Sequence, residues 1–266
     1  MYTLSGHKNT VSSIKCFLNN KDNNQYLISA DRNHVVIIWE VNNNFNRKYK
    51  IETKYDNDIY SCLLVFPFNK TENFIITSTY DIDSFTKIFS FETGKFIRYL
   101  EKIKNNQTCY LIEWINNKND KYYIIQLSLG QILINNLFED EQYCNLKIKP
   151  EKDLYSGFIY NNYLYFSSFD GYIRILNLFE KTIFKVVQFP NCSFCHIIQW
   201  NYKYIIMADF YKKTIKIMDL DNNKYISNYS GQHNDVVKCV KKIYHPLYGE
   251  SLLSSGWDKT IKLWII

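Results

Sequence analysis

The segment "SGWDKTIKLWII" (residues 255–266) places a tight polar turn directly before an apolar strand that runs to the last residue of the sequence. Unpaired N–H and C=O groups along such a strand would promote pairing with other chains. We therefore expect another segment of this chain to lie beside it. The identity of that segment decides the architecture.

The same pattern occurs six times along the chain. "YLISADRNHVVIIWEV" (26–41) matches "SLLSSGWDKTIKLWII" (251–266) almost position for position. Each unit reads as an apolar strand, a polar turn and a second strand in which apolar and polar residues alternate. Four further segments share the pattern: 75–92, 124–137, 165–178 and 205–220.

An aromatic residue that ends another short strand precedes each pair. These marker residues are Phe17, Phe66, Trp114, Tyr160, Trp200 and Tyr244, with spacings of 49, 48, 46, 40 and 44 residues. Units of this length with several short strands are typical of β-propeller blades. The sequence therefore predicts one all-β domain over residues 1–266, a β-propeller with six blades of four antiparallel strands.

Short motifs in the first and last units resemble those of the WD-repeat family. They are "SGH" (5–7), "WE" (39–40), "SGQH" (230–233) and "GWDKTIKLW" (256–264). The resemblance implies a buried polar network in each of these two units. In the last unit it comprises His233, Ser254, Asp258 and Trp264; in the first it comprises His7, Ser29, Asn33 and Trp39, with Asn in place of Asp. Units two to five keep the strand pattern and lose most of these residues, and Lys212 takes the Asp position in the fifth.

Serine, histidine and aspartate together could also suggest hydrolytic catalysis. Their recurrence as a feature of a blade favours a structural role, because buried polar groups must be satisfied and a connected network stiffens its surroundings. We therefore predict no catalytic residues.

The resemblance also implies how the ring closes. In the family the sequence repeat is offset from the blade, so "MYTLS" (1–5) is expected to pair beside "TIKLWII" (260–266) as the fourth strand of the last blade. This pairing would close a ring of six blades. The alternative is an open ring whose gap is filled by a partner.

Cofactor and metal motifs are weak. "CSFCH" (192–196) matches the C-x-x-C-H of haem attachment. However, Cys195, Cys109 and Cys239 each fall five residues before a marker aromatic, so one small apolar position is predicted to account for all three thiols. The five histidines are scattered and none belongs to a zinc-type spacing. The sequence predicts no cofactor and no metal site.

Charge and cysteine content limit the location and the partners. The net charge of +6 is spread along the chain, whereas a dedicated nucleic-acid binder would cluster its basic residues. No uncharged run reaches the roughly 18–20 apolar residues of a membrane span, and no apolar signal segment is present at the N-terminus. Seven irregularly spaced cysteines do not favour a disulfide framework, so a reducing, cytoplasmic location is expected.

The resemblance points to one candidate binding surface. In the family, the residue before the turn aspartate lies on the face where the strand-to-strand turns converge. That position holds Arg32, Tyr80, Phe169, Tyr211 and Trp257. Exposed aromatic rings with an arginine are typical of binding hot spots. The alternative is that the rings pack onto their own blades.

We therefore expect a non-enzymatic scaffold that binds a protein or peptide on the turn face and forms part of a complex. Three other functions are considered. Weak RNA binding through Lys, Arg and Tyr side chains on the surface would show a steep salt dependence. An obligate subunit of a larger assembly would show a wide apolar side patch or an open seam. A hydrolytic propeller would show ionisable side chains converging at the channel mouth.

Overall fold

The structure is a computed structural model that describes residues 5–9, 11–19, 23–41, 46–53, 59–67, 71–79, 85–100, 108–139, 141–149, 152–189, 191–201, 203–219, 221–222, 224–231, 233–245, 247, 249–258 and 260–265. The elements in these residues are strands, arranged in six antiparallel sheets. This confirms the predicted all-β propeller fold with six blades. No helix in the described part is long and apolar enough to cross a membrane.

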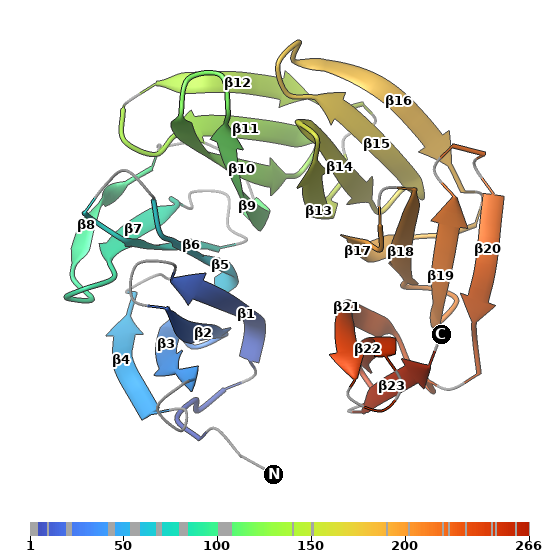
Figure 1. Cartoon of the computed structure of the whole chain (residues 1–266), viewed down its shortest axis with the longest axis horizontal. Helices are drawn as coiled ribbons and strands as arrows, with labels where there is room; N and C mark the ends of the chain where they lie inside the picture. The colour runs from blue at the N-terminus through green and yellow to red at the C-terminus, as the bar shows by residue number, and fades with distance from the viewer. Residues whose placement is uncertain are drawn as a thin grey trace. The chain divides into compact units, whose positions relative to one another are not determined.

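Unit 1 (Met1–Lys147) contains three of these sheets, named blades 1 to 3 in chain order. In each of them, strands that follow one another in sequence are hydrogen-bonded neighbours (Figure 1). Blade 1 has β1 (Val11–Asn19), β2 (Asn24–Asp31), β3 (Val35–Glu40) and β4 (Asn46–Glu52); blade 2 has β5 (Ile59–Val65), β6 (Phe74–Thr79), β7 (Lys87–Ser90) and β8 (Phe96–Tyr99); blade 3 has β9 (Thr108–Asn116), β10 (Lys121–Ser128), β11 (Gln131–Asn136) and β12 (Gln142–Lys147).

Unit 2 (Ile148–Ile266) contains blades 4 to 6. Blade 4 has β13 (Leu154–Tyr160), β14 (Tyr163–Ser168), β15 (Tyr172–Asn177) and β16 (Thr182–Gln188); blade 5 has β17 (Phe194–Gln199), β18 (Tyr204–Asp209), β19 (Thr214–Asp219) and β20 (Lys224–Tyr229); blade 6 has β21 (Val237–His245), β22 (Gly249–Gly256) and β23 (Ile261–Ile265). Residues 1–4 of the expected fourth strand of blade 6 lie outside the described residues. Ring closure by that strand, and the single-domain organisation, remain predictions.

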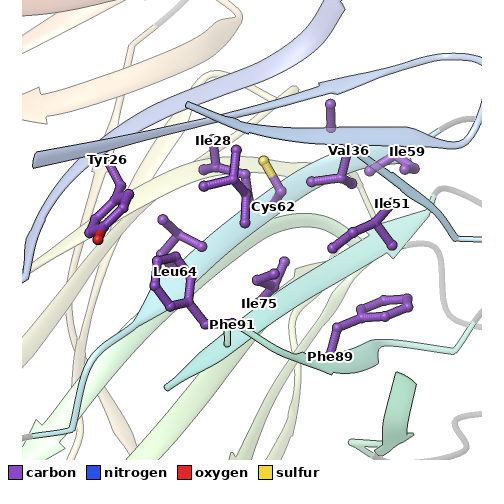
Figure 2. Close-up of a cluster of buried hydrophobic side chains, with 12 residues drawn as sticks. Tyr26, Ile28, Val36, Ile51, Ile59, Cys62, Leu64, Ile75, Phe89 and Phe91 are labelled. Carbon is purple, nitrogen blue, oxygen red and sulfur yellow. The ribbon is translucent and has the colours of Figure 1, made fainter. Parts of the chain in front are cut away.

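Neighbouring blades within a unit bury an apolar layer between them. In unit 1, Ile28 and Val36 of blade 1 lie in one cluster with Leu64 and Ile75 of blade 2 (Figure 2). All four side chains are completely buried. Burying a side chain of this size stabilises the folded state by about 1.5–3 kcal/mol. The alternating strands of the sequence therefore obtain their core from the adjacent blade.

Unit 2 is built in the same way. Between blades 4 and 5, Ile173 and Phe194 belong to one buried cluster, and between blades 5 and 6, Ile206 and Leu252 belong to another. These residues come from strands whose apolar, β-favouring composition suits burial on a pleated surface. Isoleucine and phenylalanine side chains thus fill these interfaces between blades.

A β-bulge recurs in the first strand of all six sheets. In blade 4, Leu154 pairs with Ser168 and Ser156 pairs with Ser167, so Tyr155 has no partner of its own in the register. The same shift sets apart one residue in each other first strand: Ser12, Tyr60, Cys109, Cys195 and Lys238. A bulge bends the strand and turns the extra side chain in a new direction.

Two of these bulge residues join their blade to the next one. Ser12 Oγ donates to the carbonyl oxygen of Ala30 at 3.2 Å and to that of Ile59 in blade 2. Cys195 Sγ lies 2.9 Å from the carbonyl oxygen of Val237 in blade 6. The recurring thiol or hydroxyl is therefore a link between consecutive blades.

The prediction that Cys109, Cys195 and Cys239 share one position is wrong for Cys239. Lys238 holds the bulge position in blade 6, and Cys239 pairs as His196 does in blade 5. The reason is that β21 has one more residue between its bulge and its marker aromatic, so counting back from the aromatic gives the wrong position.

The interface between blades 1 and 2 can be tested with two leucines. Leu64→Ala should lower the free energy of unfolding by about 2–5 kcal/mol, because it removes methyl groups from a fully buried site and leaves a cavity. Leu18→Ala, at a side chain of β1 that is 48% exposed, should change it by less than about 1 kcal/mol. Urea unfolding followed by circular dichroism measures both; equal shifts would contradict the assigned core.

Candidate functional site

The histidine in blade 6 stands at the centre of a polar network. His233 Nδ1 lies 2.8 Å from the Asp258 carboxylate, and Nε2 lies 2.7 Å from Ser254 Oγ. Trp264 Nε1 donates to the same Ser254 oxygen at 2.7 Å. A neutral imidazole satisfies every group when Nδ1–H donates to the carboxylate and the serine hydroxyl donates to Nε2. Ser254 is buried and fully engaged, so its hydroxyl cannot be reached by a substrate.

Asp258 also holds the turn that follows β22. Its Oδ1 accepts the backbone N–H of Thr260 at 3.1 Å, and its Oδ2 accepts that of Asn234 at 3.1 Å. Burial alone would raise the pKa of Asp258, but the hydrogen bonds from Thr260 and His233 outweigh it and hold the pKa well below its usual value. The carboxylate is thus a permanent anion that orders the turn.

Blade 1 has the same network with a different carboxylate. His7 Nε2 lies 2.7 Å from Ser29 Oγ, and Trp39 Nε1 donates to that oxygen at 2.9 Å. The partner of His7 Nδ1 is Asp31 at 2.8 Å, rather than Asn33. Asn33 only donates its backbone N–H to Asp31 Oδ1, at 2.8 Å. The carboxylate has moved from the turn to the last residue of β2, two positions upstream, and from there it still reaches both the imidazole and the turn.

Blades 4 and 5 contain other buried ion pairs in place of the histidine network. In blade 5, Lys216 Nζ lies 2.7 Å from Asp209 Oδ2 and 2.9 Å from Cys192 Sγ. Asp209 ends β18 as Asp31 ends β2, so the carboxylate in blade 5 does not come from the position of Lys212. In blade 4, Arg174 Nη2 lies 2.7 Å from Asp170 Oδ2. Both cations are buried and stand at the third residue of their strands.

These pairs are electrostatically satisfied. Burial alone would lower the pKa of Lys216, but hydrogen bonds to Asp209 and Cys192 outweigh it and raise the pKa, so the ammonium stays charged. Burial alone would likewise raise the pKa of Asp170, but hydrogen bonds from Arg174 and Ser168 lower it. Blades 4 and 5 therefore hold buried ion pairs where blades 1 and 6 hold the histidine network.

Substituting Asp31 and Asn33 one at a time tests which of them is the hydrogen-bond partner of His7 in blade 1. Asp31→Ala should lower the free energy of unfolding by about 3 kcal/mol or more, because the buried imidazole and two turn N–H groups lose their acceptor. Asn33→Ala removes an exposed side chain and should cost less than about 0.5 kcal/mol. The urea unfolding midpoints of the two variants measure these losses of stability. A larger loss of stability for Asn33→Ala than for Asp31→Ala would contradict the assignment of Asp31 as the partner of His7.

In unit 2, each of the three turns that follow a second strand makes an equivalent backbone hydrogen bond. The N–H of Phe169 donates to the carbonyl of Asp153 at 3.1 Å, that of Phe210 to Ser193 at 2.7 Å, and that of Trp257 to Val236 at 2.9 Å. Each acceptor directly precedes the first strand of its blade. The three aromatic residues are therefore structurally equivalent.

This equivalence changes one predicted site residue. Phe210, rather than Tyr211, is the counterpart of Phe169 and Trp257, and Tyr211 is the next residue in the same turn. Of the other predicted residues, Arg32 lies exposed on the β2–β3 turn of unit 1, and Tyr80 lies outside the described residues. Blade 3 has Leu129 directly after β10, and its side chain is 41% exposed.

The three turns bring their rings together in unit 2. Phe169 and Tyr211 have ring centroids 5.4 Å apart, and Phe210 lies 5.5 Å from Tyr211 and 5.4 Å from Trp257. Tyr155, the bulge residue of blade 4, lies 5.8 Å from Phe169. We call this group the aromatic cluster: Tyr155, Phe169, Phe210, Tyr211 and Trp257.

The cluster has a partly buried base and an exposed surface. Phe210 packs against the buried core between blades 5 and 6. Tyr211 is 62% exposed and Trp257 is 55% exposed. Exposed rings and packed rings, the two possibilities considered for this surface, thus both occur: Phe210 packs, whereas Tyr211 and Trp257 are exposed to solvent.

A lysine stands over the cluster. Lys238, the bulge residue of blade 6, places Nζ 6.0 Å from the Tyr155 ring, 5.6 Å from the Phe210 ring and 5.5 Å from the Trp257 ring. These distances are in the range of cation–π attraction. One ammonium therefore contacts rings from blades 4, 5 and 6.

Sequence reasoning did not find Phe210, Tyr155 or Lys238. The turn in blade 5 has one residue more than that in blade 1, so counting back from the third strand leads to Tyr211 while counting forward from β18 leads to Phe210. Tyr155 and Lys238 occupy the bulge, which has no recognisable residue type in the sequence. An alignment anchored on the second strands would have found Phe210.

The "CSFCH" side chains lie against different partners. Cys192 Sγ contacts Lys216, Cys195 Sγ contacts the Val237 carbonyl, and His196 Nε2 lies 3.9 Å from Cys239 Sγ. Burial raises the pKa of Cys195 to about 12, so its thiol stays protonated. No group of three or more His, Cys, Asp or Glu residues suited to a metal ion occurs in the described ranges.

Glu113 of β9 is a partly buried carboxylate without a hydrogen-bond or ion-pair partner among the described residues. Burial raises its pKa to about 7. A carboxylate with a raised pKa is one of the features expected of an acid–base site. Catalysis by a pair of carboxylates would need a second one close to it, and Glu113 has no such neighbour in the described part of unit 1.

Glu113 should make stability depend on pH. Because its pKa is raised on folding, the native state binds the proton more tightly, and stability falls as pH rises from about 4.5 through about 7. Glu113→Gln cannot ionise, so its advantage over wild type should grow across this range by about 1–3 kcal/mol. Urea unfolding between pH 5 and pH 8 tests this at half-unit steps, with the exposed Glu72→Gln as control. Parallel pH profiles for wild type and Glu113→Gln would contradict it.

Comparison with known proteins gives a match to the first and last repeats of the chain. The family model described as WD domain, G-beta repeat matches residues 1–40 and 223–264. These ranges hold the His7 and His233 networks. No curated protein sequence matches the chain.

Proposed function

We propose that this chain, a member of the WD-repeat family, is a non-enzymatic scaffold that binds a protein or peptide on the aromatic cluster. WD-repeat propellers generally act as protein-interaction scaffolds, although a fold by itself does not fix a function. The observation that carries the proposal is local. Turns of three successive blades bring exposed rings and one lysine into contact on a rigid base.

The cluster has the physical character of a binding surface. Tyr and Trp are enriched in interface hot spots because they bury a large area and lose little side-chain entropy. Tyr211 and Trp257 are more than half exposed although they contact other rings, so a partner could still bury most of their surface. Phe210 contacts both Tyr211 and Trp257 and packs on the core between blades 5 and 6, so it supports the two exposed rings.

The absence of enzymatic activity is part of the proposal. In blade 6, Ser254 and His233 are buried and Trp264 also donates to the serine, so Ser254 is not an accessible nucleophile. The high pKa of Cys195 disfavours a thiolate. We further propose an intracellular, reducing location, supported by free, buried thiols such as Cys62 and Cys144.

Membership of a larger complex is the second candidate, and a specific observation favours it. The outermost strands β8, β16 and β20 carry apolar side chains that are 45–64% exposed: Phe96, Ile97, Tyr99, Phe184, Val186, Tyr225 and Ile226. Exposed apolar groups on edge strands are typical of surfaces covered by another chain. A complex subunit could use these sides while the cluster binds a separate peptide.

Tyr211→Ala combined with Trp257→Ala should release the partner. These substitutions remove the two most exposed rings of the cluster and should weaken binding by about 2 kcal/mol or more, roughly thirtyfold. Affinity capture of tagged protein from its native cells, with quantitative mass spectrometry, measures the loss. Circular dichroism melting confirms that the variant is folded.

The matched control is Tyr244→Ala, which removes a ring that is 79% exposed near the opposite end of β21 from Lys238. It should retain the partner. If the double variant keeps every partner, the rings of the cluster serve only to pack the fold, and the proposal fails. If Phe184→Ser loses the partner while the double variant retains it, the result would instead support the complex-subunit function, with binding through the sides of the blades.

A further inference from the structure

We infer that the partner segment bound by the aromatic cluster carries a carboxylate next to an apolar side chain. This rests on the proposed function and adds the chemistry of the ligand. It concerns Lys238, which sequence analysis did not identify, and the ring faces beneath its ammonium.

The cation position over the rings is already occupied. Ring faces attract ammonium and guanidinium groups, and a cluster of this kind would by itself suit a lysine or arginine of a partner. Here Lys238 Nζ lies within 6.0 Å of three rings, from Tyr155, Phe210 and Trp257. A second cation at this place would meet like-charge repulsion from the Lys238 ammonium. The arrangement therefore selects against basic partner residues.

Lys238 has no carboxylate within 4.0 Å among the described residues. Three acids of the neighbouring turns are engaged elsewhere. Asp209 binds Lys216, Asp258 binds His233, and Asp153 accepts the Tyr155 hydroxyl at 3.2 Å. Within the part of the chain that the structure describes, the contacts of the ammonium are with ring faces. Its three N–H donors could therefore form a charge-assisted hydrogen bond to an incoming carboxylate.

The exposed rings of the cluster specify the rest of the ligand. Tyr211 and Trp257 present apolar faces to solvent, and a side chain stacked there would bury them. A ligand that satisfies both features has an acidic residue adjacent to an aromatic or aliphatic one. A single-stranded nucleic acid could also stack on rings, but it requires a basic groove along its backbone. In the β18–β19 turn, Lys213 already donates to the Asn234 carbonyl at 2.8 Å.

Three labelled peptides test the inference: Gly-Glu-Phe-Asp-Gly, its basic counterpart Gly-Lys-Phe-Lys-Gly, and the neutral Gly-Gln-Phe-Asn-Gly. Wild type should bind the acidic peptide about tenfold more tightly than the neutral one, measured by fluorescence anisotropy. Lys238→Met should lose this preference, and Lys238→Glu should favour the basic peptide. Lys224→Met removes an exposed lysine at the other end of blade 5, beside Asp219, and should keep the wild-type preference.

The inference is wrong if wild type binds the acidic peptide no more tightly than the neutral one, or if Lys238→Met keeps the preference. It is also wrong if labelled oligo-uridine binds more tightly than the acidic peptide with a steep salt dependence, since the surface would then bind nucleic acid. The capture experiment separates this from the proposed function. A partner lost from the Tyr211 and Trp257 double variant but kept by Lys238→Glu would leave the scaffold function standing and refute only the acidic ligand.

Discussion

One backbone hydrogen bond sets the geometry of unit 2. It joins the turn after the second strand to the residue before the first strand, in blades 4, 5 and 6 alike. Because both ends are main-chain atoms, the bond fixes where the turn lies whatever side chain the turn carries. The bulge that follows in the first strand then directs Tyr155 and Lys238 toward that turn. The aromatic cluster results from these two backbone features.

The fold could be predicted from the sequence, and the details of the site only in part. Six repeats of alternating strands were sufficient for the blades, because side-chain alternation directly reports burial. The carboxylate partner of His7 was misplaced at Asn33, since a shift from the turn to Asp31 keeps the hydrogen bonds while it changes the spacing. Phe210 was missed because one extra turn residue alters the count from the third strand but leaves the register of β18 and β19 intact.

The middle blades explain why motif matching is strong only at the ends of the chain. Each blade needs its buried polar groups satisfied, and that demand does not specify histidine. Arg174 with Asp170 and Lys216 with Asp209 meet it with ion pairs whose cation comes from the third strand. Blades 4 and 5 are therefore held by ion pairs that a search for the histidine motif does not detect. A buried pair of this kind tolerates the loss of one member poorly, which ties the two positions together.

The separation between turn and strand has a consequence for how such a protein can change over time. A turn residue that gains or loses a neighbour, as at Phe210 and Tyr211, leaves the strand register unaffected. The residues that meet a partner can thus vary while the packing between blades stays under its own, separate constraint. Recognition in this fold is a modular property: a lineage could exchange its ligand without rebuilding its core.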